Sequence, residues 1–151
     1  LAFLRANYFF ENWNNVLGAV RANAVLPTFL DPLTRAIPMA VVKDIGMAGA
    51  DLLRGPAWTG QRTIDFASFD ASPADVAATL GSVLGKTVKT VAVPREQQAG
   101  ILQSGGFRPE IAAAFVQMYE GINGGVAVAA ADSERRRGTT TLAAAARALA
   151  A

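Results

Sequence analysis

The sequence predicts an α/β fold whose strands are short, buried and parallel. Residues 1–5 form an apolar run without alternation, which is typical of a strand covered on both faces. Apolar residues then recur at helical spacing over residues 11–24. A strand–helix–strand pattern follows over residues 62–93, and such units join parallel neighbours in one sheet. We expect the 151 residues to form a single α/β region, 1–151.

The first helix is predicted over residues 11–24, directly after the first strand. Its apolar face is formed by Trp13, Val16, Leu17, Val20 and Ala24. Asn7 or Asn12 can cap its start, because an asparagine side chain accepts hydrogen bonds from the first backbone amides of a helix. Two prolines then predict a loop over residues 26–36.

A second strand and helix are predicted from residue 37 onwards. Residues 37–42 form a short apolar strand, and Pro38 confines its start to a sheet edge or to the first strand positions. Asp44 precedes apolar residues at helical spacing and is interpreted as an N-cap, although a catalytic carboxylate is the alternative. Residues 54–56 (Arg-Gly-Pro) have the order that ends a helix.

The strand–helix–strand unit has the clearest local signals. Residues 62–69 alternate between apolar and polar positions, which predicts a strand. Ser72 to Asp75 (Ser-Pro-Ala-Asp) is a strong helix start, with a capping serine, a first-turn proline and an acid near the helix N-terminus. This helix ends at Gly85, and residues 87–93 form the next strand.

The last third of the sequence predicts three helices and one loop. The helices cover residues 95–104, 109–123 and 142–149, the last with a threonine cap. Residues 125–138 read as a surface loop that ends in three arginines, and such a run is more often solvated than a phosphate clamp.

Composition excludes several classes of function. The chain has no cysteine and no histidine, so thiol chemistry, thiolate metal sites and histidine bases are absent. The net charge is +2, and the basic residues are scattered, so no nucleic-acid partner is expected. No apolar run approaches the ~18 residues of a membrane span, and no signal peptide is visible. We therefore expect no membrane association, and the cytoplasm as the location.

Familiar cofactor and catalytic motifs are also missing. No glycine-rich dinucleotide fingerprint follows a strand and opens a helix, and no Walker lysine motif occurs. The acidic residues are dispersed, so no metal site and no pair of catalytic carboxylates is predicted. Tyr8 and Tyr119 are the only tyrosines, and neither has a lysine four residues later. Catalysis would depend on these groups, on carboxylates or lysines, or on a bound cofactor.

Residues 5–14 (Arg-Ala-Asn-Tyr-Phe-Phe-Glu-Asn-Trp-Asn) lie where the first strand ends and a helix begins, the place where open α/β sheets bind ligands. This stretch resembles the segment after the sixth strand of NmrA-like proteins, which are atypical short-chain dehydrogenase/reductase relatives that include NAD(P)H:quinone oxidoreductase-like members. Further short sequence motifs that resemble those of the same family occur in the same order along the chain: residues 25–29 (VLPTF), 37–39 (IPM), 43–46 (KDIG), 72–76 (SPADV), 93–95 (VPR), 118–123 (MYEGIN) and 138–142 (GTTTL).

The resemblance implies the C-terminal portion of a Rossmann-like NAD(P)-binding fold, with the glycine-rich N-terminal half absent. It implies NADP or NAD as the cofactor of the full-length protein, with weak or no binding by this chain alone. Asn7, Tyr8 and Phe9 would line the nicotinamide side of the cleft. The substrate side would include Phe10, Asn12, Trp13, Met118 and Tyr119, with Asn123 near the same cleft. Aromatic residues at a strand end are, however, more often part of a core than of a pocket.

Three functions remain open from the sequence. The first is an NAD(P)H-dependent reductase of a quinone or carbonyl compound, in which the cofactor carries the chemistry. The second is a dinucleotide-sensing regulator without turnover, and the third is an inactive fragment or interaction module. The chain lacks an initiator Met and opens directly in strand-like sequence, which favours a C-terminal fragment. An apolar strand without its neighbours would be exposed, so a homodimer is a further expectation.

Overall fold

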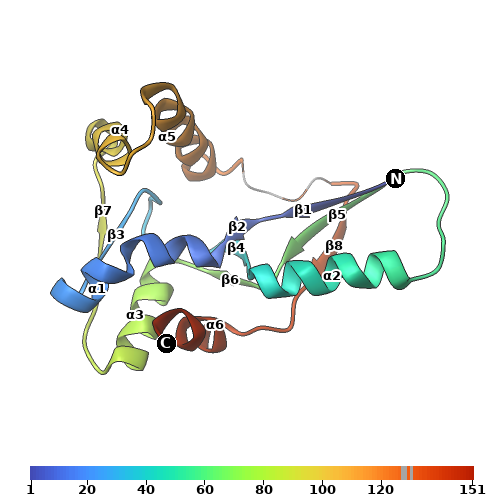
Figure 1. The fold of residues 1–151 in the computed structure, drawn as a ribbon, viewed down its shortest axis with the longest axis horizontal. Helices are drawn as coiled ribbons and strands as arrows, with labels where there is room; N and C mark the ends of the chain where they lie inside the picture. The colour runs from blue at the N-terminus through green and yellow to red at the C-terminus, as the bar shows by residue number, and fades with distance from the viewer. Residues whose placement is uncertain (127–128, 130) are drawn as a thin grey trace.

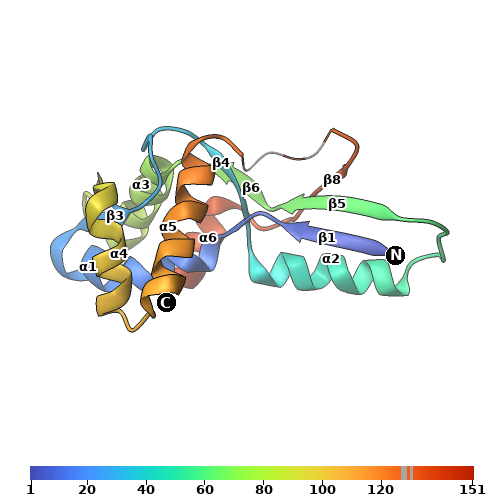
Figure 2. The ribbon, with the colours of Figure 1, turned by 90° about the horizontal axis from the view of Figure 1, so that it is seen from above.

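The computed structural model describes residues 1–126, 129 and 131–151 of the chain. It has a helical body and an extended arm of strands (Figures 1 and 2). The strands are β1 (Ala2–Ala6), β2 (Tyr8–Phe9), β3 (Val25–Thr28), β4 (Ile37–Ala40), β5 (Arg62–Ala67), β6 (Phe69–Ala71), β7 (Lys89–Ala92) and β8 (Glu134–Arg137). The helices are the 3-10 helix η1 (Phe10–Val16), α1 (Leu17–Asn23), α2 (Val42–Arg54), α3 (Pro73–Leu84), α4 (Arg95–Ser104), α5 (Pro109–Asn123) and α6 (Leu142–Ala150).

The arm is a parallel sheet in the order β1–β5–β8, which confirms the predicted α/β class. Helix α2 runs along one face of it (Figure 2). Leu4 and Phe66 point to this helix and form a small core with Ala48. No described strand pairs with the second edge of β1, and the side chain of Phe3 is exposed there.

Two smaller sheets connect the arm to the helical body. Strand β4 lies between β2 and β6, parallel to β2 and antiparallel to β6. Strands β3 and β7 pair in parallel beneath α4 and α5 (Figure 1). The main core lies where η1, α1, α3 and α6 meet these sheets, and its fully buried side chains include Phe10, Leu26, Met39, Val76 and Leu80. None of the described helices has the length and apolar character needed to cross a bilayer.

Local signals at two helix starts are confirmed. The Ser72 hydroxyl accepts a hydrogen bond from the Asp75 amide, and the Asp75 carboxylate accepts one from the Ser72 amide, which completes a capping box. Thr141 caps α6 by accepting the Ala144 amide. Gly85 ends α3 with a φ of 66°, a conformation that glycine adopts without strain.

Three predictions in the first half were wrong. The predicted helix 11–24 is divided into η1 and α1, and neither has a side-chain cap, so neither Asn7 nor Asn12 has the expected role. The first residues of the predicted loop 26–36 belong to strand β3 instead. Proline is tolerated at position 27 because β3 pairs only with β7, so that it is an edge strand. Asp44 is not an N-cap: α2 starts at Val42, and the Asp44 carboxylate bonds to other segments instead.

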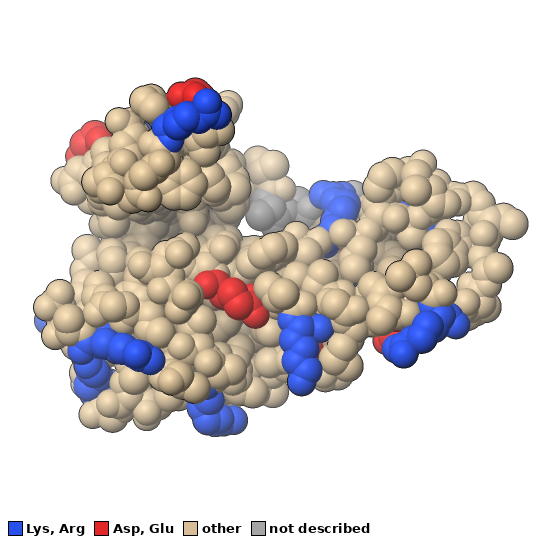
Figure 3. Space-filling view, viewed as in Figure 1, with Lys and Arg blue, Asp and Glu red and all other residues tan. Residues whose placement is uncertain are grey.

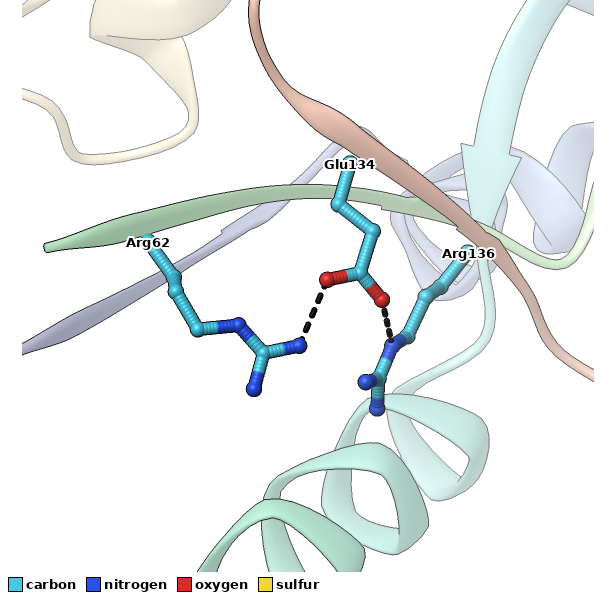
Figure 4. Close-up of polar contacts among 3 residues, drawn as sticks. All are labelled: Arg62, Glu134 and Arg136. Carbon is cyan, nitrogen blue, oxygen red and sulfur yellow. Dashed lines mark hydrogen bonds and ion pairs between the residues drawn. The ribbon is translucent and has the colours of Figure 1, made fainter. Parts of the chain in front are cut away.

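The predicted surface loop 125–138 was wrong in its last part, because residues 134–137 form β8. This strand is polar and consists of a glutamate and three arginines, so hydrophobic patterning could not reveal it. Ion pairs support it on the face next to α2, where Glu134 lies between Arg62, 2.6 Å away, and Arg136, 2.5 Å away (Figure 4). Hydrogen bonds from both guanidinium groups lower the pKa of Glu134. Residues 127, 128 and 130 of the predicted loop lie outside the described residues.

Candidate functional site

The segment after β1 passes from the arm into the body, and backbone bonds fix its position. Both the amide and the side-chain Nδ2 of Asn7 donate to the carbonyl oxygen of Phe66, at 3.0 and 2.9 Å. Tyr8 and Phe9 then pair with Met39 and Ala40 as strand β2. The predicted nicotinamide-side residues are therefore held at the carboxyl end of β1, where ligands bind in open α/β sheets.

An aromatic cluster joins this segment to α5. The hydroxyl oxygens of Tyr8 and Tyr119 lie 3.4 Å apart. The Tyr8 ring also packs against Trp13, with ring centroids 6.0 Å apart. Tyr119 contacts Phe29 edge to face at 5.2 Å. The structure thus brings together Tyr8, Trp13 and Tyr119, and adds Phe29, which follows β3. Their roles in ligand binding stay predictions.

Burial raises the pKa values of the two tyrosines. Desolvation strongly raises the pKa of Tyr8, the charge and hydroxyl of Tyr119 raise it further, and a hydrogen bond with Asn12 opposes these effects. Desolvation also raises the pKa of Tyr119, against a smaller lowering by Tyr8. Both side chains therefore remain neutral phenols at physiological pH and can donate hydrogen bonds.

The adjacent aromatic residues differ in exposure. Phe10 and Trp13 are 1% and 2% exposed and belong to the main core, where Phe10 packs edge to face against Phe69. The Trp13 Nε1 atom has no hydrogen-bond partner among the described residues. By contrast, Phe9 is 43% exposed, and Met118 is similarly accessible on α5. Substrate contact stays a prediction for all of these residues, and Phe9 and Met118 are the ones that a ligand can reach directly.

A polar latch holds the end of α5 against the segment after β3. The Asn123 side chain donates to the Phe29 carbonyl and accepts from the Asp31 amide, at 2.8 and 2.9 Å. Arg35 donates to the carbonyls of Ile122 and Asn123. These hydrogen bonds hold Phe29 beside Tyr119, so Asn123 stabilises the aromatic cluster without being part of it. The sequence reading placed Asn123 near the cleft but gave no signal for Arg35.

The chain's residues fit only part of a dinucleotide. The exposed Phe9 ring and the Asn7 amide suit a flat, amide-bearing ring, since the Oδ1 of Asn7 accepts hydrogen bonds. The sequence contains no glycine-rich turn of the kind that cradles a pyrophosphate. Among the described residues, no cluster of acidic side chains is able to hold a metal ion.

Comparison with known proteins gives a match to structures and not to sequences. No protein-family model and no curated protein matches the chain. The structure resembles Citrobacter sp. triphenylmethane reductase complexed with NADP(H), with a TM-score of 0.78 and 18% identity over 98% of this chain and 52% of that one. A second structure of that enzyme gives 0.69 and 18% over 87% and 46%. A Staphylococcus aureus nucleoside-diphosphate-sugar epimerase gives 0.73 and 16% over 97% and 51%.

The chain spans about half the length of these solved chains. At such identities the likeness concerns the fold, and it covers nearly all of the elements described above. The strand-end segment with Asn7, Tyr8 and Phe9 is part of the shared region. The chain therefore has the α/β fold found in about half of a reductase that binds NADP(H) and in about half of a sugar-nucleotide epimerase.

Proposed function

We propose that this chain is the substrate-side portion of an NmrA-like, NAD(P)-binding protein of the cytoplasm, and that the full-length protein reduces a quinone or carbonyl acceptor. The observation that carries the proposal is the convergence of Tyr8, Tyr119 and Phe29 at a strand end where the next residue, Phe9, is exposed, in a fold shared with an NADP(H)-complexed reductase. That neighbour is described in connection with the bioremediation of triphenylmethane dyes.

The residues divide into two roles. Phe9 packs against the nicotinamide ring, and Asn7 accepts a hydrogen bond from its carboxamide, while Tyr8 supports this side. The bound cofactor supplies a hydride. Tyr119, with Met118 beside it, faces the acceptor, and its neutral phenol donates a hydrogen bond to the acceptor oxygen. A chain without histidine or cysteine suits this chemistry, since the protein orients and the cofactor reacts.

Activity of the full-length protein tests the proposal. We expect NADPH oxidation with a panel of quinones and carbonyl compounds, and an approximately tenfold lower kcat/KM when Phe9 is replaced by alanine, from loss of ring packing worth about 1.4 kcal/mol. Phe3→Ala is the matched control, because Phe3 is equally exposed but lies on β1 away from the cluster. Equal losses in both variants would contradict the assignment of Phe9.

The 151-residue chain by itself is expected to bind NADPH weakly or not at all. The glycine-rich turn that would hold the pyrophosphate is not in this sequence, and phosphate contacts supply much of dinucleotide affinity. Titration followed by the fluorescence of Trp13 and Trp58 measures this directly. A micromolar affinity would show that the nicotinamide-side residues suffice and would overturn this expectation.

A non-catalytic dinucleotide sensor is the second candidate. The burial of both tyrosine hydroxyls and their contact with each other favours it, because a proton donor that is already engaged is less available to a substrate. A full-length protein that binds NADPH but oxidises it with no acceptor would support the sensor. A full-length protein that binds no dinucleotide would leave the inactive interaction module as the remaining function.

A further inference from the structure

A hollow is lined in part by Phe29, the residue that contacts Tyr119. It has a volume of about 430 Å³, which is within the range of small-ligand pockets. Its lining comes from the segments that follow the carboxyl ends of the parallel strands β3 and β7, and from α4 and α5. Figure 3 shows the recess between this helical lobe and the body. Its lining includes Phe29, Asp31, Val93, Arg95, Gln98 and Glu120.

The polar groups of this hollow are mainly hydrogen-bond acceptors. Gln98 is only 5% exposed, and its Nε2 donates to the Val93 carbonyl at 3.0 Å. Its Oε1 accepts no hydrogen bond from any described residue and is not fully buried, so it is accessible to a donor on a ligand. The Asp31 carboxylate takes part in no ion pair within the described part of the chain.

The positive groups near the hollow are already engaged. The Arg95 guanidinium is paired with the Glu120 carboxylate at the rim. Arg35 lies close by but donates to backbone carbonyls, including that of Asp31, and not to a carboxylate. What remains is one carboxylate and one amide oxygen beside an apolar wall formed by Phe29 and Val93. This combination favours a ligand that brings both hydrogen-bond donors and a positive charge.

We propose that this hollow binds a protonated amine carried on an aromatic or apolar body. The ammonium group donates to the Asp31 carboxylate and to Gln98 Oε1, and the body packs on Phe29, whose ring also attracts a nearby cation. An anion is disfavoured because it would meet the Asp31 charge. The amine site shares Phe29 with the aromatic cluster, but it involves neither a cofactor nor the Tyr8 hydroxyl.

The test is a nuclear magnetic resonance titration of the ¹⁵N-labelled chain with benzylammonium. We expect saturable shifts of the backbone amides of residues 29–31, 93–98 and 120–123, with a Kd on the order of 1 mM for so small a probe. Benzyl alcohol and benzoate, which keep the ring but lack the charge or reverse it, should bind at least about fivefold more weakly. These readouts do not depend on NADPH or on turnover.

Two substitutions test whether the Asp31 carboxylate is the group that binds the ammonium ion. Asp31→Asn should raise the Kd for benzylammonium by about fivefold and reduce the difference from benzyl alcohol. Asp51→Asn is the matched control, because Asp51 is an exposed acid on α2, far from the hollow in the fold. Both sites are exposed, so both variants should fold. Benzoate binding as tightly as benzylammonium, shifts centred on other residues, or equal effects of the two variants would overturn the proposal.

Discussion

Replacing Phe10 with alanine is expected to lower the free energy of unfolding by about 3–5 kcal/mol. The Phe10 side chain is 1% exposed and packs against Phe69 with ring centroids 5.5 Å apart, in the centre of the main core. Removing the ring loses its burial and leaves a cavity that rigid neighbours on η1 and β4 fill poorly. Urea denaturation of the two proteins, followed by far-ultraviolet circular dichroism, measures the difference.

Phe9→Ala is the control for this prediction. Phe9 precedes Phe10 in the chain but is 43% exposed, so its loss should cost less than about 1 kcal/mol. The pair separates the ligand contact that the resemblance implied for both phenylalanines from the core packing that the structure shows for Phe10. Similar losses of stability in both variants would contradict this division.

The change from strand to 3-10 helix explains why the sequence pattern could not show that Phe9 is exposed and Phe10 is buried. Strand β2 ends at Phe9 and η1 starts at Phe10, so neither the strand period nor the helix period runs through both residues. Elsewhere local signals succeeded: the strand β1 and the capping box of α3 lie where they were predicted. The prediction that the first strand is covered on both faces was wrong, because β1 is exposed at alternate positions, including Phe3. Local rules work where one regular element continues for several residues.

Non-local pairing accounts for what was missed. Strand β8 carries four charged residues, and only its pairing with β5 and the ion pairs around Glu134 make it a strand. Tyr8 and Tyr119 could be assigned to one site through the family resemblance, because both lie in sequence motifs that match the family. Phe29 also lies in a matching segment (residues 25–29), but its contact with Tyr119 had no local signal. Like the position of Arg35, it depends on hydrogen bonds to Asn123, about 90 residues away in sequence.

Replacing Asp44 with alanine is the second change expected to have a large effect, a loss of about 3 kcal/mol at pH 7. The Asp44 side chain is 4% exposed and ties α2 to two distant segments. It accepts hydrogen bonds from the Ser68 hydroxyl at 2.6 Å, and from the Thr140 hydroxyl and amide at 2.8 and 3.1 Å. Alanine leaves these three donors without their acceptor. Urea denaturation at pH 7 gives the size of the loss.

The loss should depend on pH in a defined direction. Desolvation raises the pKa of Asp44, but the hydrogen bonds from Ser68 and Thr140 outweigh it, so the pKa lies below its ordinary value. A carboxylate with a lowered folded-state pKa stabilises the protein fully above the unfolded-state pKa of about 3.9, and this contribution disappears as the pH falls through the folded-state value. The difference between the two proteins should therefore be constant from about pH 7 to 5 and shrink below about pH 4.

Thr140→Val shows whether the loss arises from these bonds or from the changed volume at position 44. Valine keeps the shape of threonine and its backbone amide but removes one donor, so we expect a loss of about 1–2 kcal/mol. In the double variant the two losses should not add, because the Thr140 hydroxyl has no partner once Asp44 is gone. Asp75 and Glu134, whose pKa values are also lowered, are present in every variant and cancel in the comparison. Additive losses, or a difference that grows below pH 4, would show that the Asp44 carboxylate does not anchor α2 to the segment before α6.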